Sequence, residues 1–258
     1  VEQLNKSSIF WQRILAGSSS PMQRAASIRG MLYASLTVGT LDRTIDLAQL
    51  YLDSEKWKQL GKDLEKETLS VLSKATEDYA SKEKSGGNIK MAGSILVKVA
   101  QRNHNLPRRD DLLRTGAYYM AMAGDWNSAQ FAAKWYQDAK LKKNWADMRY
   151  LEARSLEQQM IFGDAAEMFL EVEAKAPKFK KWKTCLTKAE TLALVESDYN
   201  RAGRAAFRLS KRTGVRSQKR SHLKRSLGYY EKSKALDEAL IIAQEYLEAS
   251  RSFGDKLE

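Results

Sequence analysis

Two-residue turn signals recur along this chain at nearly even intervals, and no other feature restricts its fold as strongly. They stand at six places: Gly39-Thr40, Gly87-Asn88, Gly124-Asp125, Gly163-Asp164, Ser197-Asp198 and Leu236-Asp237. Counted between their second residues, the spacings are 48, 37, 39, 34 and 39 residues. Two antiparallel helices of about 15 residues, with their turns, occupy roughly 34 to 40 residues. Since one such pair cannot bury its own apolar face, the spacing predicts helix pairs that stack on one another.

Small residues precede five of these turns by eight to ten positions, and four of the five have an aromatic residue or leucine three residues later. A small residue lets two helix backbones approach, and a bulky neighbour one turn away fills the space beside it. We therefore expect these small residues at helix crossings: Gly30 with Tyr33, Gly116 with Tyr119, Ala153 with Leu156, Ala189 with Leu192, and Gly228 with the shifted pair Tyr229-Tyr230.

Composition agrees with an all-helical chain. Gly and Pro together number 17, about 7% of the residues against roughly 12% in average proteins. No segment shows sustained period-two alternation, so no sheet is expected. The longest apolar run, Ala117 to Ala123, has seven residues, whereas a membrane span needs about 20. The predicted fold class is all-α: a right-handed α-solenoid of stacked antiparallel helix pairs, with about 12 to 14 helices.

Several helix boundaries can be placed from local signals. Ser20-Pro21 is a cap followed by proline at the first helical position. Thr40 is expected to cap a helix over 41–52. A long charged helix with Trp57, Leu60 and Leu64 on its apolar face is expected between Ser54 and about Lys82.

The repeat resembles the tetratricopeptide repeat (TPR). The closest match runs from Arg149 to Pro177, where the family's small, bulky, aromatic, alanine, aromatic and proline positions are occupied by Ala153, Leu156, Phe162, Ala165, Phe169 and Pro177. The resemblance departs from the family's pattern in a late turn after Gly116, a missing tryptophan near the repeat start, and a single terminal proline. Residues 106–258 are predicted to be TPR-like repeats, continuous in a single solenoid with a degenerate helical-repeat part at 1–105.

The resemblance implies a non-catalytic scaffold that binds a peptide or partner protein in a groove lined by the first helix of each pair. The groove positions it implies include Asp147, Gln158 and His222, and its main members are Tyr150, Arg154, Glu157, Lys183, Glu190, Arg225, Tyr229 and Lys232. Such a groove is polar and becomes basic toward the C-terminal end. It would suit an acidic peptide or a C-terminal carboxylate.

A basic segment supports the same partner chemistry. No acidic residue occurs between Asp198 and Glu231, and this stretch supplies +10 of the net charge of +12. Its cations are Arg201, Arg204, Arg208, Lys211, Arg212, Arg216, Lys219, Arg220, Lys224 and Arg225. Two interpretations stay open: a docking surface for an acidic partner, or a solvated helix face that pairs with acidic residues of neighbouring helices. Nucleic acid is the less favoured partner, because the charge is confined to one or two repeats and no base-reading pattern accompanies it.

Catalytic motifs are absent from the sequence. There are two histidines, with His104 in a predicted loop, and neither zinc spacing nor a phosphate-binding loop nor a nucleophile elbow occurs. Cys185 is expected to be a buried small hydrophobe. Glu171 and Glu173 stand two apart on a helix, so they should point apart on a solvated surface. We therefore predict no enzymatic activity, no cofactor and no metal, and we expect Trp126, Trp135, Trp145 and Trp182 to be packing residues.

The compartment stays open at this stage. One cysteine rules out an internal disulfide and fits the cytoplasm as well as the periplasm. The chain opens on Val1 and closes abruptly after Gly254, which favours a piece of a longer protein. A non-catalytic helical part of a larger cell-envelope enzyme is therefore a further alternative.

Overall fold

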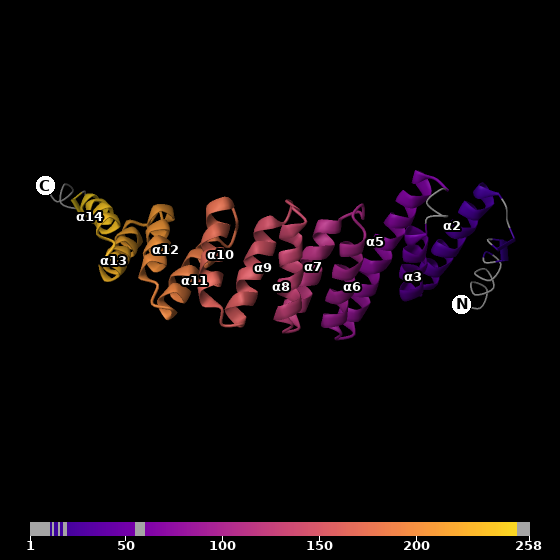
Figure 1. The fold of residues 1–258 in the computed structure, drawn as a ribbon, viewed down its shortest axis with the longest axis horizontal. Coiled ribbons are helices and arrows are strands. Elements are labelled where there is room, and N and C mark those ends of the chain that lie inside the picture. The colour runs from indigo at the N-terminus through magenta and orange to yellow at the C-terminus, as the bar shows by residue number, and fades with distance from the viewer. Residues whose placement is uncertain (1–10, 12, 15, 18–19, 55–59, 252–258) are drawn as a thin grey trace. The chain divides into compact units, whose positions relative to one another are not determined.

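The structure, a computed structural model, describes residues 11, 13–14, 16–17, 20–54 and 60–251. These residues form α-helices and no strand, as expected, and Figure 1 shows helix following helix along the chain. The described helices number twelve: α2 (Pro21–Val38), α3 (Leu41–Asp53), α5 (Lys62–Ser85), α6 (Ile89–Arg102), α7 (Arg109–Met122), α8 (Trp126–Asp138), α9 (Trp145–Gln158), α10 (Phe162–Lys175), α11 (Trp182–Val195), α12 (Tyr199–Arg212), α13 (Arg216–Ser233) and α14 (Leu236–Arg251).

The chain divides into two compact units, Val1–Asp125 and Trp126–Glu258, here called unit 1 and unit 2. Within each unit, every helix packs against the helix that precedes it in the sequence. The all-α class and the stacking of consecutive helices are thus confirmed. The predicted change from degenerate to regular repeats at 105/106 concerns the sequence pattern and stays a prediction.

The turns that mark the repeat follow a more even spacing than the sequence signals suggested. Each contains one residue with φ between 59° and 87°: Gly39, Gly87, Gly124, Met160, Ser197 and Lys234. Their spacings are 48, 37, 36, 37 and 37 residues. Four consecutive intervals therefore match a repeat of 36 or 37 residues.

Two of the predicted turns were misplaced. Gly163-Asp164 lies inside α10, and Leu236-Asp237 opens α14, because the left-handed turn residues are Met160 and Lys234 instead. Gly163 has a different role. A Cβ at this position would come within 2.5 Å of the Glu196 carboxylate, so the missing side chain leaves room for that group.

Small residues do lie at helix crossings, with one correction. A Cβ on Gly116 would come within 2.8 Å of the Gly93 carbonyl oxygen, so α6 and α7 approach to backbone contact. Ala153 and Ala189 are fully buried, as expected.

Gly228 was the wrong residue in the last pair, because a Cβ there would meet nothing within 4 Å. Ser226 takes the crossing position. It is buried, and its hydroxyl donates to the Gly203 carbonyl at 2.9 Å. A serine was missed because its hydroxyl needs a partner that the sequence alone does not reveal.

The long charged helix begins later than expected. Gly61 has a φ of 113° and stands just before α5, which runs from Lys62 to Ser85. The predicted start near Ser54 is wrong, and Trp57 lies outside the described residues. The starts at Pro21 and Leu41 are confirmed.

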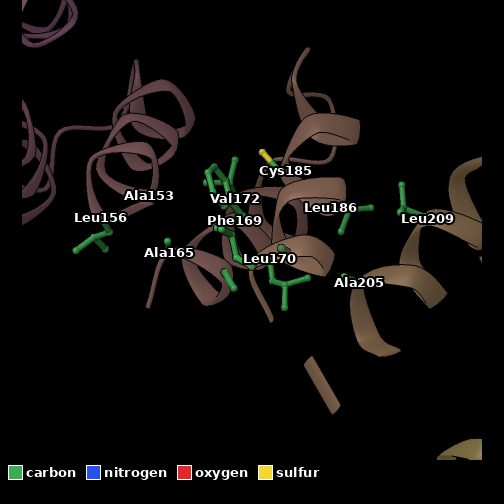
Figure 2. Close-up of a cluster of buried hydrophobic side chains, with 13 residues drawn as sticks. Ala153, Leu156, Ala165, Phe169, Leu170, Val172, Cys185, Leu186, Ala205 and Leu209 are labelled. Atoms are coloured by element: carbon green, nitrogen blue, oxygen red, sulfur yellow. The ribbon is translucent and has the colours of Figure 1, made fainter. Parts of the chain in front are cut away.

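The core of unit 2 passes from one pair to the next. Figure 2 shows Phe169, Leu170 and Val172 of α10 beside Cys185 and Leu186 of α11, with Ala205 and Leu209 of α12 beyond them. Phe169 and Leu186 are fully buried. This core holds the first helices α9 and α11 in place, whereas α13 packs with α14 in a second cluster that contains Leu223 and Ile242. The candidate groove residues are carried by α9, α11 and α13.

Candidate functional site

All the predicted groove residues lie on α9, α11 and α13, and the structure brings several of them together. They are Tyr150, Arg154 and Glu157 on α9, Lys183 and Glu190 on α11, and Arg225, Tyr229 and Lys232 on α13.

A cleft of about 510 Å³ lies between α9 and α11. Its lining combines three threonines of one helix face with charged groups: Thr184, Thr187, Thr191, Glu157, Lys183, Lys188 and Leu192. The Lys188 ammonium lies 2.5 Å from the Glu157 carboxylate, and Arg154 approaches the same carboxylate at 3.2 Å. The cleft is therefore polar, and one ion pair joins its two walls.

A second polar cluster joins α11 to α13 around Glu190. The Glu190 side chain is only 9% exposed, and Arg225 Nε lies 2.8 Å from its carboxylate. The Tyr229 hydroxyl donates to the same carboxylate at 3.2 Å, and Arg225 also donates to His222 Nδ1 at 2.9 Å. The carboxylate at the centre is thus neutralised, and positive charge lies around it.

The pKa values in this cluster report its electrostatics. The pKa of His222 is lowered, first by burial and then by Arg225 and Lys183, both of which oppose a second positive charge. Burial, followed by the charge of Glu190, raises the pKa of Tyr229. At neutral pH His222 is therefore neutral and Tyr229 keeps its donor proton.

Two predicted groove residues have other neighbours. Tyr150 packs against Phe169 and Phe179 with ring centroids 5.7 and 5.8 Å apart, and burial raises its pKa. Lys232 lies over the ring of Tyr199 at 5.3 Å. Tyr150 is thus largely part of the core.

The basic stripe on α12 is paired with carboxylates of neighbouring second helices. Glu167 of α10 accepts from Arg201 at 3.0 Å and from Arg204 at 3.1 Å. Lys211 reaches Glu245 of α14 at 2.6 Å. These partners lie 34 to 37 residues apart, so the pairs join one repeat to the next.

Glu173 is the most enclosed partner of that stripe. It is buried, with its side chain 9% exposed, and it accepts from Arg212 at 2.7 Å and lies 3.4 Å from Arg208. The expectation of a solvated surface was therefore wrong for this residue. Glu171 does point elsewhere, to Arg149 and Lys175. A spacing of two residues shows that Glu171 and Glu173 point in different directions from their helix. It does not show which neighbouring helix packs over either side chain.

The remaining cations of the segment lie at the start of α13. Arg216 donates to the Ala249 carbonyl at 3.3 Å. Lys219, Arg220 and Lys224 form no ion pair with the described part of the chain. The ten cations therefore separate into an α12 group that is paired internally and an α13 group that, Arg225 and Arg216 apart, is not.

A second acid-free segment escaped the sequence analysis. Residues 174–189 carry six lysines and no carboxylate: Lys175, Lys178, Lys180, Lys181, Lys183 and Lys188. Over 174–230 there are 16 basic and three acidic residues, a net charge of +13. A charge count in a window of one repeat would have found this segment, because its charge lies around a loop and not along one helix face.

The cysteine and the tryptophans of unit 2 are buried or half-buried side chains of the helix stack. Cys185 is fully buried, and burial raises the pKa of its thiol to about 12, so the thiol stays protonated. In the described residues no group of three or more His, Cys, Asp or Glu side chains is arranged to hold a metal. The four tryptophans of unit 2 are half-buried, and Arg212 lies 4.2 Å from the ring centroid of Trp182.

None of the described helices combines the length and the apolar character that a membrane span requires.

Comparisons with known proteins find similarity among solved structures. The crystal structure of BtubC (BKLC) from P. vanneervenii is 14% identical, with 83% of this chain and 92% of that chain covered and a TM-score of 0.44. The TPR2AB-domain:pHSP90 complex of yeast Sti1 is also 14% identical, with 96% and 92% covered and a TM-score of 0.33. No family model and no curated protein matches the chain. At these identities and TM-scores neither similarity assigns a function, so the functional conclusion depends on the geometry of unit 2.

Proposed function

We propose that this chain is a non-catalytic scaffold that binds a peptide segment of a partner protein along the first helices of unit 2. The observation that carries the proposal is the polar cleft between α9 and α11. Thr184, Thr187 and Thr191 follow one another at helical spacing on its α11 wall. Threonine hydroxyls both donate and accept, so a row of them suits the backbone of an extended peptide.

The charges beside the cleft favour an acidic peptide or a C-terminal carboxylate. Lys183 lines the cleft, and its charge also lowers the pKa of His222 on α13. The Glu190 carboxylate, which would repel such a ligand, is already bound by Arg225 and Tyr229. Glu157, the carboxylate in the cleft lining, is likewise paired with Lys188 and Arg154. A ligand carboxylate near Lys183 therefore meets a positive field, because both Glu157 and Glu190 are already paired.

The predicted groove residues enter this proposal with different roles. Glu157 and Lys183 line the cleft. Glu190, Arg225 and Tyr229 form the polar cluster that joins α11 to α13. Arg154 acts through its ion pair with Glu157. Tyr150 and Lys232, held by aromatic neighbours, define the ends of the face.

Blocking the cleft tests the proposal. Peptides are first selected for binding to the full chain from a displayed random library, and their affinities are measured by fluorescence anisotropy. The double variant Thr187→Trp, Thr191→Trp fills the cleft from two exposed positions and should weaken the selected peptides at least tenfold. The control Asn127→Trp adds a tryptophan at an exposed position of α8 and should leave their affinities unchanged. Equal affinity for the cleft-blocked chain and the parent chain would overturn the proposal.

A further inference from the structure

The exposed cations at one end of unit 2 lie together, although two separate segments of the sequence supply them. One group surrounds the connection from α10 to α11, and the other opens α13 after the connection from α12. Arg212, at the end of α12, donates to the Pro177 carbonyl in the first connection and lies over Trp182 at the start of α11. The two connections are therefore neighbours at the same end of the stack.

Five cations at this end form what we call the basic edge: Lys178, Lys180, Lys183, Lys219 and Arg220. The three lysines are exposed, and Lys219 and Arg220 are half-exposed. None of the five forms an ion pair with a residue that the structure describes. The α12 stripe differs, because Glu167, Glu173 and Glu245 hold its cations.

Helix stability does not account for this placement. Cations near a helix N-terminus oppose the macrodipole. Neither α11 nor α13 has an acidic residue in its first turn that would offset this cost. The mutual repulsion of the five cations adds to that cost. An anionic partner bound at the edge would relieve both.

The aromatic residues at this end indicate which kind of anion fits. Single-stranded nucleic acid binds through bases stacked on exposed aromatic planes. Here Arg212 covers Trp182, and Phe179 packs against Tyr150. The edge thus offers charge without free stacking planes, which favours carboxylates on a flexible chain over unpaired bases.

We propose that the basic edge is a docking surface for an acidic stretch of a partner polypeptide. The edge adjoins the cleft on the first helices at Lys183, which belongs to both, but binds its own ligand. Corresponding helices of consecutive pairs are about 20 Å apart, at about 10 Å for each packed helix. An extended polypeptide covers this distance in about six residues at 3.3 to 3.6 Å each. A stretch of about twelve acidic residues therefore reaches both cation groups.

A labelled peptide of twelve glutamates is the direct probe, with its affinity for the full chain measured by fluorescence anisotropy at 0.05 to 0.3 M salt. The variants Lys178→Glu, Lys180→Glu and, separately, Lys219→Glu, Arg220→Glu should each weaken binding at least tenfold at 0.1 M salt and reduce its salt dependence. The control Lys134→Glu, Lys234→Glu makes the same charge change at exposed positions away from the edge and should change affinity less than threefold. All four positions of the edge variants are at the surface, and circular dichroism verifies the fold.

Three outcomes would overturn the proposal. Equal weakening by edge and control variants would show a non-specific response to net charge. The chain could instead bind a 20-base-pair duplex or phosphatidylserine vesicles and not the glutamate peptide. That result would show that the partner of the edge is a nucleic acid or a membrane surface and not an acidic polypeptide. Loss of the glutamate peptide in the cleft-blocked Thr187→Trp, Thr191→Trp chain would show that edge and cleft are one site. Retention of that peptide by the same chain supports a separate edge, whether or not the cleft binds its own ligand.

Discussion

Unit 1 and unit 2 are built from the same kind of helix pair, but different residue types occupy the turn between the two helices of a pair. Within the helix pairs of unit 1 the left-handed turn residues are Gly39 and Gly87, whereas in unit 2 they are Met160, Ser197 and Lys234. The tightest crossing of unit 1 is glycine against glycine, and unit 2 uses alanine and serine at the same register. The repeat therefore fixes a backbone geometry that several residue types can satisfy.

The two units differ more in the charge of their surfaces than in the packing of their helices. Unit 1 carries 18 basic and 14 acidic residues, while in unit 2 residues 174–230 alone have a net charge of +13. Unit 1 also has a cleft between first helices, α5 and α7, but its volume is about 190 Å³ and the Arg108–Glu77 ion pair, at 2.8 Å, lies in its lining. A larger cleft of about 790 Å³ lies beside the Gly87 turn of unit 1, so cleft volume does not distinguish the two units. The difference is the excess of basic residues in unit 2, on which its proposed docking role depends.

The largest expected change in the free energy of unfolding distinguishes a glycine at a close helix crossing, Gly116, from a glycine in open space, Gly228. Gly116→Ala places a Cβ 2.8 Å from the Gly93 carbonyl oxygen, a backbone atom that cannot rotate away. We expect a loss of about 3 kcal/mol, the upper end of ordinary overpacking. Gly228→Ala, in open space on α13, should instead gain about 0.5–1 kcal/mol from helix propensity. Urea unfolding of the full chain measures both, and equal midpoints would show that the close approach in unit 1 is not tight.

The next effect concerns the ion pairs that join repeats in unit 2. Glu173→Ala removes a buried carboxylate that holds Arg208 and Arg212, and we expect a loss of about 2 kcal/mol. Glu167→Ala acts on the same two helices, but its side chain is 51% exposed, so about 0.5 kcal/mol is expected. Thermal or urea unfolding distinguishes the two. A larger loss for Glu167 than for Glu173 would mean that burial does not decide the strength of these pairs.

Substitutions at the turn residues should change the free energy of unfolding by smaller amounts, and in opposite directions at Ser197 and Gly124. Ser197→Gly relieves a non-glycine residue at φ 59° and should stabilise the chain by about 0.5 kcal/mol. Gly124→Ala imposes that strain at φ 78° and should cost about 1 kcal/mol. Unfolding midpoints that move in the same direction for both variants would contradict the assignment of one shared turn conformation to both units.

The smallest effect is a proton equilibrium in unit 2. The folded pKa of His222 lies below its usual value of about 6.5, so its contribution to stability is present above that pH and is lost as pH falls through the folded pKa. Arg225→Gln removes one of the two cations that lower this pKa and should raise it toward 6.5. A titration of the His222 ring protons by NMR measures the change, and an unaltered pKa would remove Arg225 as a cause.

The sequence predicts the framework of this molecule better than its surface. Turn spacing, small crossing residues such as Ala153 and Ala189, and the helix starts at Pro21 and Leu41 depend on local sequence, so their pattern is visible in one dimension. The capping hydrogen bonds expected from Ser20 and Thr40 do not form, because neither side chain accepts from the first turn of its helix. Ser226 was missed because a serine is acceptable at a crossing only where a carbonyl such as that of Gly203 accepts its proton. Met160 and Lys234 were missed because nothing in those residue types indicates a left-handed backbone.

The candidate site was predictable only in part. Glu190, Arg225 and Tyr229 could be placed on the correct helices from the repeat register, yet their mutual hydrogen bonds depend on how α11 and α13 are stacked. The internal pairing of the α12 stripe depends on α10 in the same way. The basic edge requires two loops about one repeat apart to be neighbours, which no local pattern shows.

Protection of individual lysines from acetylation is the sharpest test of the proposal that unit 2 docks an acidic polypeptide at the basic edge. The full chain is acetylated briefly with and without the twelve-glutamate peptide, and the modification of each lysine is quantified by mass spectrometry. We expect protection of Lys178, Lys180 and Lys219, with no change at Lys134, Lys234 or the lysines of unit 1. Protection in unit 1, or uniform protection of all exposed lysines, would contradict it.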